Sequence, residues 1–461
     1  MDKQDVLNYL DEISDEVKDL AFQVWSNPEI STEEAVSSKL FKEKLTENGF
    51  KIVNTKGVNY GFYAEYGQGS PVIAILGEYD ALPGLSQAID TKFNPLKENG
   101  PGHGCGHNLL GSAGLGSALA IKRYLEKTNT KGTIRFYGCP EEERLDGKVK
   151  MIKEDAFEGC DIALSWHPMN ANLAAKEAFL ANNSIKFKFF GTSAHAAQSP
   201  EAGRSALDAV ELMNVGANYL REHVIDKARI HYTITNGGGA PNIVPKEAES
   251  WYFVRAPHRK DVEEITNRLI KIAKGAAMMT ETTVEVELIS GCYEILPNET
   301  LFNLTYKNMM EIERPKYTDD ELQFAEDIQK TLNPDTIQGE IKKFIPSAQD
   351  EKLCMHQDLV DKEIAGSASF TGSSDSGDVS WIMPMNFMLT ACWPLGVAAH
   401  SWQATSSSGS SLGMKGMIYA AEVFTGIMYD LLNEPKLVEE AISEFNKRTE
   451  KEKYISPLDS I

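Results

Sequence analysis

The chain has 461 residues, of which 42% are hydrophobic and 25% are charged, a composition typical of a globular protein large enough for two domains. Its formal charge of −21 argues against nucleic acid or an anionic membrane surface as a partner, because both would repel it. The sequence has no apolar run long enough to span a bilayer and no basic-then-apolar signal at its start, and its six cysteines favour reduced thiols, so we expect a cytoplasmic protein.

The chain is predicted to open with helices. Apolar residues recur at helical spacing from Val6 to Val24, and Asn27-Pro28 is expected to end this first helix. A second helix is predicted from about Thr32 to Asn48. Short β runs follow, of which residues 71–76 are the clearest.

Strands then alternate with polar loops and helices. A strand at Gly132–Gly138 leads to a run of glutamates, and another at Asp161–Ser165 leads to His167. Between the first β runs and these strands, Leu109–Leu125 has the small, apolar pattern of a buried helix. Repeated strand, polar loop and helix is typical of α/β proteins. We therefore predict an α/β catalytic domain with a mixed sheet flanked by helices.

The order of elements changes near Leu180. Six elements read strand, helix, strand, strand, helix, strand, at Ser184–Phe190, Ser205–Glu222, Arg229–Thr235, Ala248–Val254, Val262–Ala276 and Thr283–Leu288. This β-α-β-β-α-β series is typical of a ferredoxin-like unit. We predict an inserted dimerisation or lid domain at residues 182–290, within a discontinuous catalytic domain of residues 1–181 and 291–461. Two helices on one face of a small sheet would leave an edge or the other face for a second copy to cover.

Beyond the insert the pattern indicates helices and loops only. Helices are predicted at Thr300–Met309, Glu321–Leu332 and Met414–Leu432. The Gly/Ser-rich stretch Ser367–Ser380 is predicted to be a loop whose Asp375 either caps a helix or belongs to a site, and His400 lies in a second loop.

Potential metal ligands follow the predicted strands on loops rich in glycine and proline. Cys105 and His107 stand two residues apart, so on an extended backbone both side chains would face the same side. Glu142 and Glu143 are adjacent and should diverge, which suits one ligand and one general base. Together with His167, these side chains supply the thiolate, imidazole and carboxylate groups that bind zinc-like cations. The pattern therefore favours a metal-dependent hydrolase.

Two other function classes remain open from the residues alone. Cys105 could be the nucleophile of a thiol hydrolase, with His107 or His400 as its base. The chain could also be a catalytically silent binding or assembly protein that keeps an enzyme fold. Chelation separates the two hydrolases, because EDTA should abolish metal-dependent activity and spare a thiol enzyme.

Several motifs in a fixed order resemble a known family. They are Asp80-Ala81-Leu82-Pro83, Cys105-Gly106-His107-Asn108, Pro140-Glu141-Glu142-Glu143, Trp166-His167-Pro168, Gly191-Thr192-Ser193-Ala194-His195-Ala196 and Ala399-His400-Ser401. Together they resemble the metallopeptidase family of aminoacylases, carboxypeptidase G, and the auxin-conjugate and hippurate amidohydrolases. The resemblance extends from about Asn27 to Gln403 and so covers nearly the whole chain.

The resemblance implies roles for particular residues. Two divalent metal ions, Zn or Mn, would be bound by Cys105, His107, Glu143, His167 and His400. Glu142 would be the general base that takes a proton from water, and Asp80 would orient a ligand from behind. In the insert, His195 and Asn242 resemble residues that stabilise the oxyanion. Arg255 resembles the residue that binds the carboxylate of the substrate.

The resemblance also implies a reaction and partners. The expected reaction is hydrolysis of the amide bond of an N-acyl or N-aroyl amino acid, or of a dipeptide, and the expected substrate is small and anionic. A dipeptidase or aminopeptidase is the alternative within the family, although an aminopeptidase would want an acidic pocket for a free amine, whereas Arg255 favours a free carboxylate. A homodimer is expected, in which His195 and Asn242 reach the active site of the partner. The sequence leaves open whether a second, different subunit is required.

Overall fold

The computed structural model describes residues 1–177, 179–348, 352–368 and 370–459. The chain divides into two compact units, and the second comprises Phe179–Ile295, Phe370–Asp378 and the segment from Ile455. The sequence boundaries assigned the last two segments to the catalytic domain. They belong to the second unit because Asp378 accepts a hydrogen bond from the Tyr293 backbone N–H (3.0 Å) and the Tyr293 hydroxyl donates to the Ile455 carbonyl (3.1 Å).

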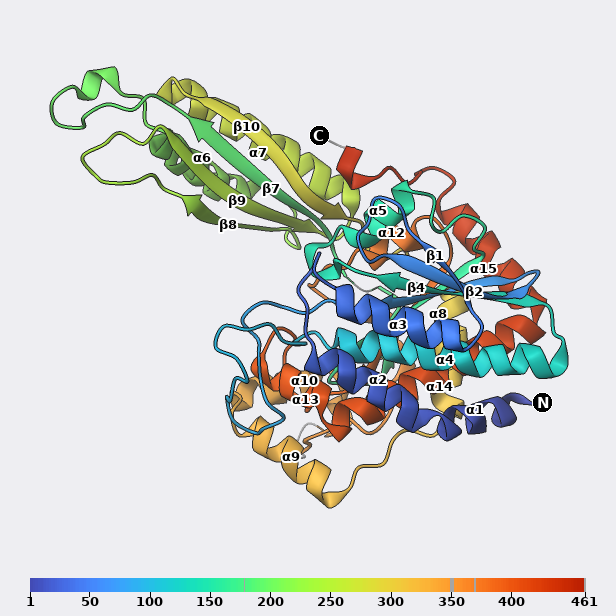
Figure 1. The fold of residues 1–461 in the computed structure, drawn as a ribbon. Helices are drawn as coiled ribbons and strands as arrows, with labels where there is room; N and C mark the ends of the chain where they lie inside the picture. The colour runs from blue at the N-terminus through green and yellow to red at the C-terminus, as the bar shows by residue number, and fades with distance from the viewer. Residues whose placement is uncertain (178, 349–351, 369, 460–461) are drawn as a thin grey trace. The chain divides into compact units, whose positions relative to one another are not determined.

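A mixed sheet is the centre of the first unit (Figure 1). Among the described residues it has seven strands in the order β1-β2-β4-β3-β5-β11-β6. They are β1 (Lys51–Asn54), β2 (Phe62–Gln68), β3 (Val72–Glu78), β4 (Gly132–Cys139), β5 (Ile162–Met169), β6 (Leu173–Ala174) and β11 (Met385–Ala391). Strands β4, β3, β5 and β11 run parallel to one another, whereas β1, β2 and β6 are paired antiparallel. The predicted α/β class with a mixed sheet is confirmed, although β11 was not predicted.

Helices flank this sheet. The buried α4 (His107–Thr128) packs against β3 and against α14 (Ser411–Asn433). Glycines allow this close approach, since a Cβ at Gly111 would lie 2.7 Å from the Glu78 carbonyl oxygen. The other helices outside the insert are α1 (Lys3–Glu12), α2 (Ser14–Ser26), α3 (Ala35–Glu47), α5 (Gly147–Lys153), α8 (Glu299–Glu311), α9 (Asp319–Gln329), α10 (Pro334–Phe344), α11 (Lys362–Ser367), α12 (Ser376–Ser380), α13 (Trp402–Gly409) and α15 (Pro435–Arg448).

The first predicted helix is in fact two helices. Helix α1 ends and α2 begins on either side of Ile13, whose φ of −99° and ψ of 3° depart from helical geometry. The apolar periodicity continues through this break because each helix buries its apolar side. The buried residues include Val6 and Leu10 in α1 and Val17 in α2. The predicted stop is confirmed, since Asn27 caps α2.

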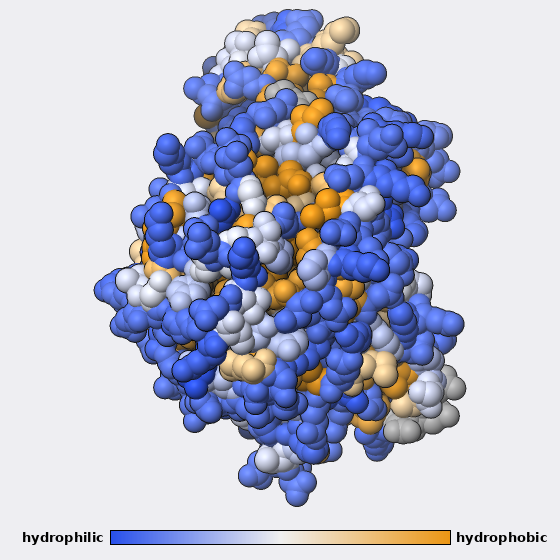
Figure 2. Space-filling view, turned by 90° about the vertical axis from the view of Figure 1, so that its right-hand side faces the viewer, coloured by the Kyte–Doolittle hydropathy of each residue, from blue (hydrophilic) through white to orange (hydrophobic). Residues whose placement is uncertain are grey.

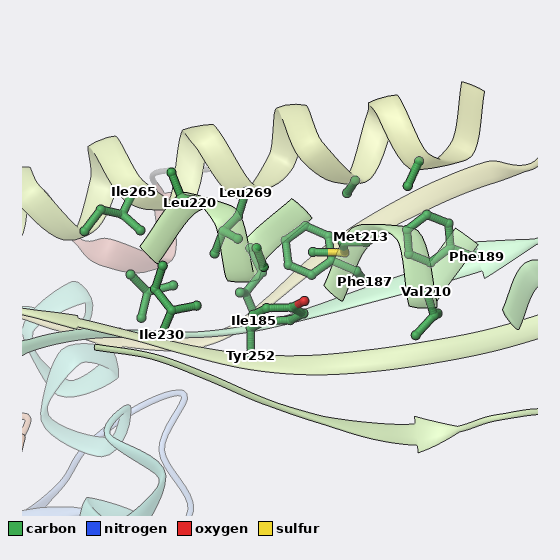
Figure 3. Close-up of a cluster of buried hydrophobic side chains, with 14 of the residues drawn as sticks. Ile185, Phe187, Phe189, Val210, Met213, Leu220, Ile230, Tyr252, Ile265 and Leu269 are labelled. Atoms are coloured by element: carbon green, nitrogen blue, oxygen red, sulfur yellow. The ribbon is translucent and has the colours of Figure 1, made fainter. Parts of the chain in front are cut away.

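The second unit has the predicted order of elements. They are β7 (Ala181–Phe190), α6 (Ala206–Leu220), β8 (Arg229–Asn236), β9 (Glu247–Ala256), α7 (Arg259–Thr280) and β10 (Thr283–Cys292). In the part of the chain that the structure describes, the sheet order is β10-β7-β9-β8 with all neighbours antiparallel, the arrangement of a ferredoxin-like unit. Figure 3 shows the core of this unit, in which Phe187 and Phe189 of β7 and Tyr252 of β9 lie between the strands and both helices.

One face of the molecule is largely hydrophilic (Figure 2). On the face shown in Figure 2, hydrophilic residues predominate and hydrophobic residues form smaller groups between them. Among the described residues, no helix is long and apolar enough to cross a membrane.

The core of the second unit should depend on Phe187. Its ring is fully buried and meets Tyr252 edge to face, with 5.5 Å between the ring centres. We expect Phe187→Ala to lower the free energy of unfolding by about 3–5 kcal/mol, because it leaves a cavity. Urea denaturation measures this, with Lys188→Ala as a control that points to the opposite face of β7 and should change stability by less than about 0.5 kcal/mol. Equal effects of the two substitutions would contradict this description of the core.

Candidate active site

The candidate site lies where parallel strands of the first unit end. Strand β3 ends at Glu78 and is followed by Asp80, and β4 is followed by a short 3-10 helix at Glu142–Arg144. The carboxyl ends of parallel strands meet at one edge of a sheet, so these side chains come together. Every candidate ligand was predicted to lie on a loop, and this prediction is wrong for two of them. His107 is the first residue of α4, and His167 lies within β5.

The segment from Cys105 to His107 was expected to be extended, but its backbone turns. Gly106 has φ 76° and ψ 22°, a left-handed conformation that favours glycine, and it is the N-cap of α4. A Cβ at this position would also lie 3.0 Å from the Pro168 ring. The chain therefore turns sharply between the two ligands, yet the turn still brings both side chains into one cluster.

Two groups of potential ligands share the thiol of Cys105. In the first group, the ligand atoms of Cys105, His107 and His167 lie within 4.8 Å of one another, and the Cys105 sulfur is 3.3 Å from His167 Nε2. In the second group, Cys105 is joined by Glu143 and His400. There the sulfur is 3.5 Å from His400 Nε2, and that nitrogen is 3.3 Å from Glu143 Oε2. The arrangement suits two neighbouring cations with one shared thiolate.

Asp80 holds a member of each group in position. Its Oδ1 accepts a hydrogen bond from His107 Nδ1 at 2.9 Å, which directs Nε2 of that ring to the cluster. Its Oδ2 accepts from the Glu143 backbone N–H at 2.9 Å and from the Ser31 hydroxyl at 2.8 Å. His167 is oriented separately, because its Nδ1 donates to the Pro168 carbonyl at 2.7 Å. Such partners fix the tautomer and direction of metal-binding imidazoles.

The residues present fit divalent cations. His107 Nε2 and Glu143 Oε1 are both buried, and neither has a hydrogen-bond partner among the described residues. Leaving a buried polar atom unsatisfied costs about 1–3 kcal/mol, which a bound cation would offset. Imidazole, thiolate and carboxylate are together the donor set of zinc and similar metals.

Burial also changes the protonation of the cluster. It raises the pKa of the Cys105 thiol well above its usual value, and the charge of Glu143 adds to this shift. Burial raises the pKa of Glu143 to about 7 and lowers the pKa of His167 to about 4. Burial likewise raises the pKa of Glu142, and the charge of Glu78 adds to it. In the absence of cations, burial therefore shifts all four groups towards their neutral forms.

The other predicted residues belong to the second unit. The segments of His195 and Asn242 are paired there, since His195 forms an isolated antiparallel bridge with Ile243 and the Ala196 N–H donates to the Asn242 carbonyl at 3.0 Å. His195 Nδ1 accepts from the backbone N–H groups of residues 197 and 198, so the ring proton is on Nε2, which can donate. Arg255 lies in β9 and donates to the Thr371 carbonyl at 3.2 Å.

Three buried titratable residues near the site were not predicted from the sequence. Glu78 Oε2 is 3.4 Å from His107 Nε2, and Glu78 Oε1 is 2.7 Å from the Lys148 ammonium. Glu34 accepts a hydrogen bond from the backbone N–H of Glu141, whose φ is 62°, and so supports the strained turn before Glu142. Burial raises the pKa of Glu34 to about 8, with a contribution from Asp80. Of these three residues, only Glu78 could have been identified from the sequence, because it places a charge at the end of an apolar strand.

Known proteins are similar to this chain over most of its length. The model of peptidase family M20/M25/M40 matches residues 74–337. The B subunit of the p-aminobenzoyl-glutamate hydrolase of Escherichia coli (strain K12) is 41% identical over 454 residues, which cover 95% of this chain and 94% of that protein. The Xaa-Arg dipeptidase of Mus musculus is 27% identical over 463 residues, covering 97% and 93%.

A solved structure has the same fold. The Bacillus subtilis YXEP protein, a dinuclear metal-binding peptidase of the M20 family, is 16% identical with a TM-score of 0.61, over 92% of this chain and 99% of that one. The predicted family and the predicted enzyme class, a hydrolase, are thus confirmed. The chain belongs to peptidase family M20/M25/M40.

Proposed function

We propose that this chain is a metal-dependent amidohydrolase that cleaves the amide bond of an N-acyl or N-aroyl amino acid, such as p-aminobenzoyl-glutamate. The observation that carries the proposal is the pair of ligand groups joined at Cys105, with Glu142 beside them and in neither. The similarity to one of the subunits of a p-aminobenzoyl-glutamate hydrolase supports the choice of substrate.

Cys105, His107, Glu143, His167 and His400 would hold two divalent cations, Zn or Mn. When bound, such cations provide Lewis acidity and lower the pKa of water from 15.7 towards about 7. Glu142 is buried, and its Oε2 lies 3.8 Å from His107 Nε2. From this position Glu142 takes a proton from the attacking water and delivers it to the leaving amine.

Arg255 binds the carboxylate of the substrate in this proposal. Its Nε is buried without a hydrogen-bond partner among the described residues, so part of the guanidinium remains available for an anion. Arginine suits this role because its planar group can donate two parallel hydrogen bonds to a carboxylate. His195 and Asn242 supply donors to the oxyanion, and the Nε2 proton of His195 supports this role.

We propose that two copies pair through the second unit. In the described part of its sheet, β8 is an edge strand. Helix α6 exposes Leu212, Val215 and Tyr219, which share one side of the helix, and Tyr219 is 75% exposed. A self-complementary patch of this kind suits a two-fold dimer. A different second subunit is also proposed, because the E. coli relative is named as one subunit of a hydrolase.

A dipeptidase is the second candidate function, because the mouse relative is an Xaa-Arg dipeptidase. The cytoplasm is the proposed compartment, since all six cysteines, each within the described residues, are free thiols.

The thiol hydrolase is disfavoured, because a nucleophilic cysteine needs a lowered pKa whereas burial raises the pKa of Cys105.

A substrate panel tests the proposed function. Purified protein should release the amino acid from p-aminobenzoyl-glutamate or another N-acyl amino acid faster than it cleaves dipeptides ending in arginine. EDTA should abolish this activity, and Zn²⁺ or Mn²⁺ should restore it. Full activity in protein that metal analysis shows to be free of cations would contradict the proposal. A protein that binds cations but cleaves nothing on the panel would be a silent family member.

Glu142→Gln should separate proton transfer from metal binding. Glutamine keeps the shape of the side chain but cannot accept the proton, so we expect kcat to fall by about 10²–10⁴-fold. Metal content should stay at the wild-type level, as measured by plasma mass spectrometry on the same sample. Loss of a cation from this variant would mean that the roles of Glu142 and Glu143 are reversed.

Co-expression tests whether His195 serves the partner subunit. His195→Ala and Glu142→Gln should each be nearly inactive alone. In a mixed dimer, one site would combine an intact Glu142 from one chain with an intact His195 from the other, so activity should return to at most about half of wild type. Differently tagged chains and two-step purification isolate the mixed dimer. No recovery in that sample would show that His195 acts within its own chain or not at all.

A further inference from the structure

Glu78 lies beside the ligand groups and contacts one of their members. Its Oε2 lies 3.4 Å from His107 Nε2, closer than Glu142 Oε2 at 3.8 Å. The three ligand atoms of Glu78, His107 and Glu142 form a group of their own that shares His107 with the first Cys105 group. Two donors each about 2.0–2.1 Å from one tetrahedral cation stand about 3.4 Å apart. The spacing between Glu78 and His107 is therefore that of two ligands of the same ion.

We propose that Glu78 is a further ligand of the cation bound by His107, with Lys148 as the residue that orients it. This inference rests on the proposed metal-dependent function. It assigns to the chain a ligand that the sequence motifs did not contain.

Lys148 explains how Glu78 is held. Its side chain is fully buried, and its ammonium lies 2.7 Å from Glu78 Oε1. One carboxylate oxygen thus contacts the lysine while the other is directed to His107. Carboxylates that bind metals are commonly fixed in this way by a hydrogen-bond donor behind them. A fully buried lysine is costly unless it is paired, so its presence here indicates that Glu78 is charged.

The ion pair of Glu78 and Lys148 also adds no net charge to the proposed metal site. A further carboxylate alone would reduce the positive charge that attracts an anionic substrate. The ammonium of Lys148 offsets the charge of Glu78, so the two together add none. The two glutamates would then have different roles. Glu78 would bind the cation and pair with Lys148, whereas Glu142 would transfer protons.

Metal binding measured without turnover tests this inference. We would dialyse each protein against buffered Zn²⁺, count the bound ions, and record the rise in Tm that Zn²⁺ produces. Glu78→Gln should bind the cation of the first group at least about 10-fold more weakly and retain the other. Glu141→Gln is the matched control, because Glu141 is also buried and paired with a lysine, Lys150 at 2.6 Å, but belongs to no ligand group. Its metal binding should equal that of wild type.

A double variant separates binding from folding. Glu78→Gln leaves Lys148 buried without its carboxylate and could lower stability for that reason alone. Glu78→Gln with Lys148→Met removes both charges, so metal-free stability should recover while the weak binding persists. Recovery of wild-type affinity in the double variant would overturn the inference, as would two tightly bound ions in Glu78→Gln. A wild-type protein that binds no cation would overturn both this inference and the proposed function.

Discussion

The rest of the site depends on the hydrogen bonds of one carboxylate, that of Asp80. It orients His107 of the first ligand group and the backbone of Glu143 of the second, and the Ser31 hydroxyl holds it in turn. Asp80 lies two residues after the end of β3, so the sheet sets the position of this carboxylate. The geometry of both groups is thereby tied to the central sheet of the first unit.

Charge is the second constraint on the centre. Cys105, Glu78 and Glu142 are buried close to the partly buried Glu143, and Lys148 is the fully buried ammonium among the described residues around them. Without further positive charge, burial shifts the pKa of Cys105 and Glu143 towards their neutral forms. Two divalent cations would reverse those shifts, because a nearby positive charge favours thiolate and carboxylate. The thiolate and carboxylate forms of these groups are therefore unfavourable without metal and favourable with it.

Much of this arrangement was predictable because its signals are local. Alternating strands and helices indicated the α/β class and the order of the insert, and the motif series indicated the cluster around Cys105. Strand β11 was missed because it is a short, wholly buried run with no alternation to mark it. The turn at Gly106 was missed because the two-residue spacing also fits an extended chain.

The missed charges have a different explanation. Lys148 lies in a short helix with Lys150 and Lys153, and such a run of lysines usually indicates a solvated face. In the structure Lys148 faces inward to Glu78, which lies 70 residues earlier in the sequence. Contacts between residues so far apart follow from the packing of α5 near the end of β3, which local patterns do not record. The segments near residues 370 and 455 joined the second unit for the same reason.

The most direct test of the account is the position of the cations in crystals of the metal-loaded protein. Anomalous diffraction at the Zn and Mn absorption edges locates each ion and identifies its element. The account predicts two ions about 3.5–4 Å apart, both bound to the Cys105 sulfur, with His107 and His167 on one and Glu143 and His400 on the other. A single ion, or two ions that do not share Cys105, would contradict it.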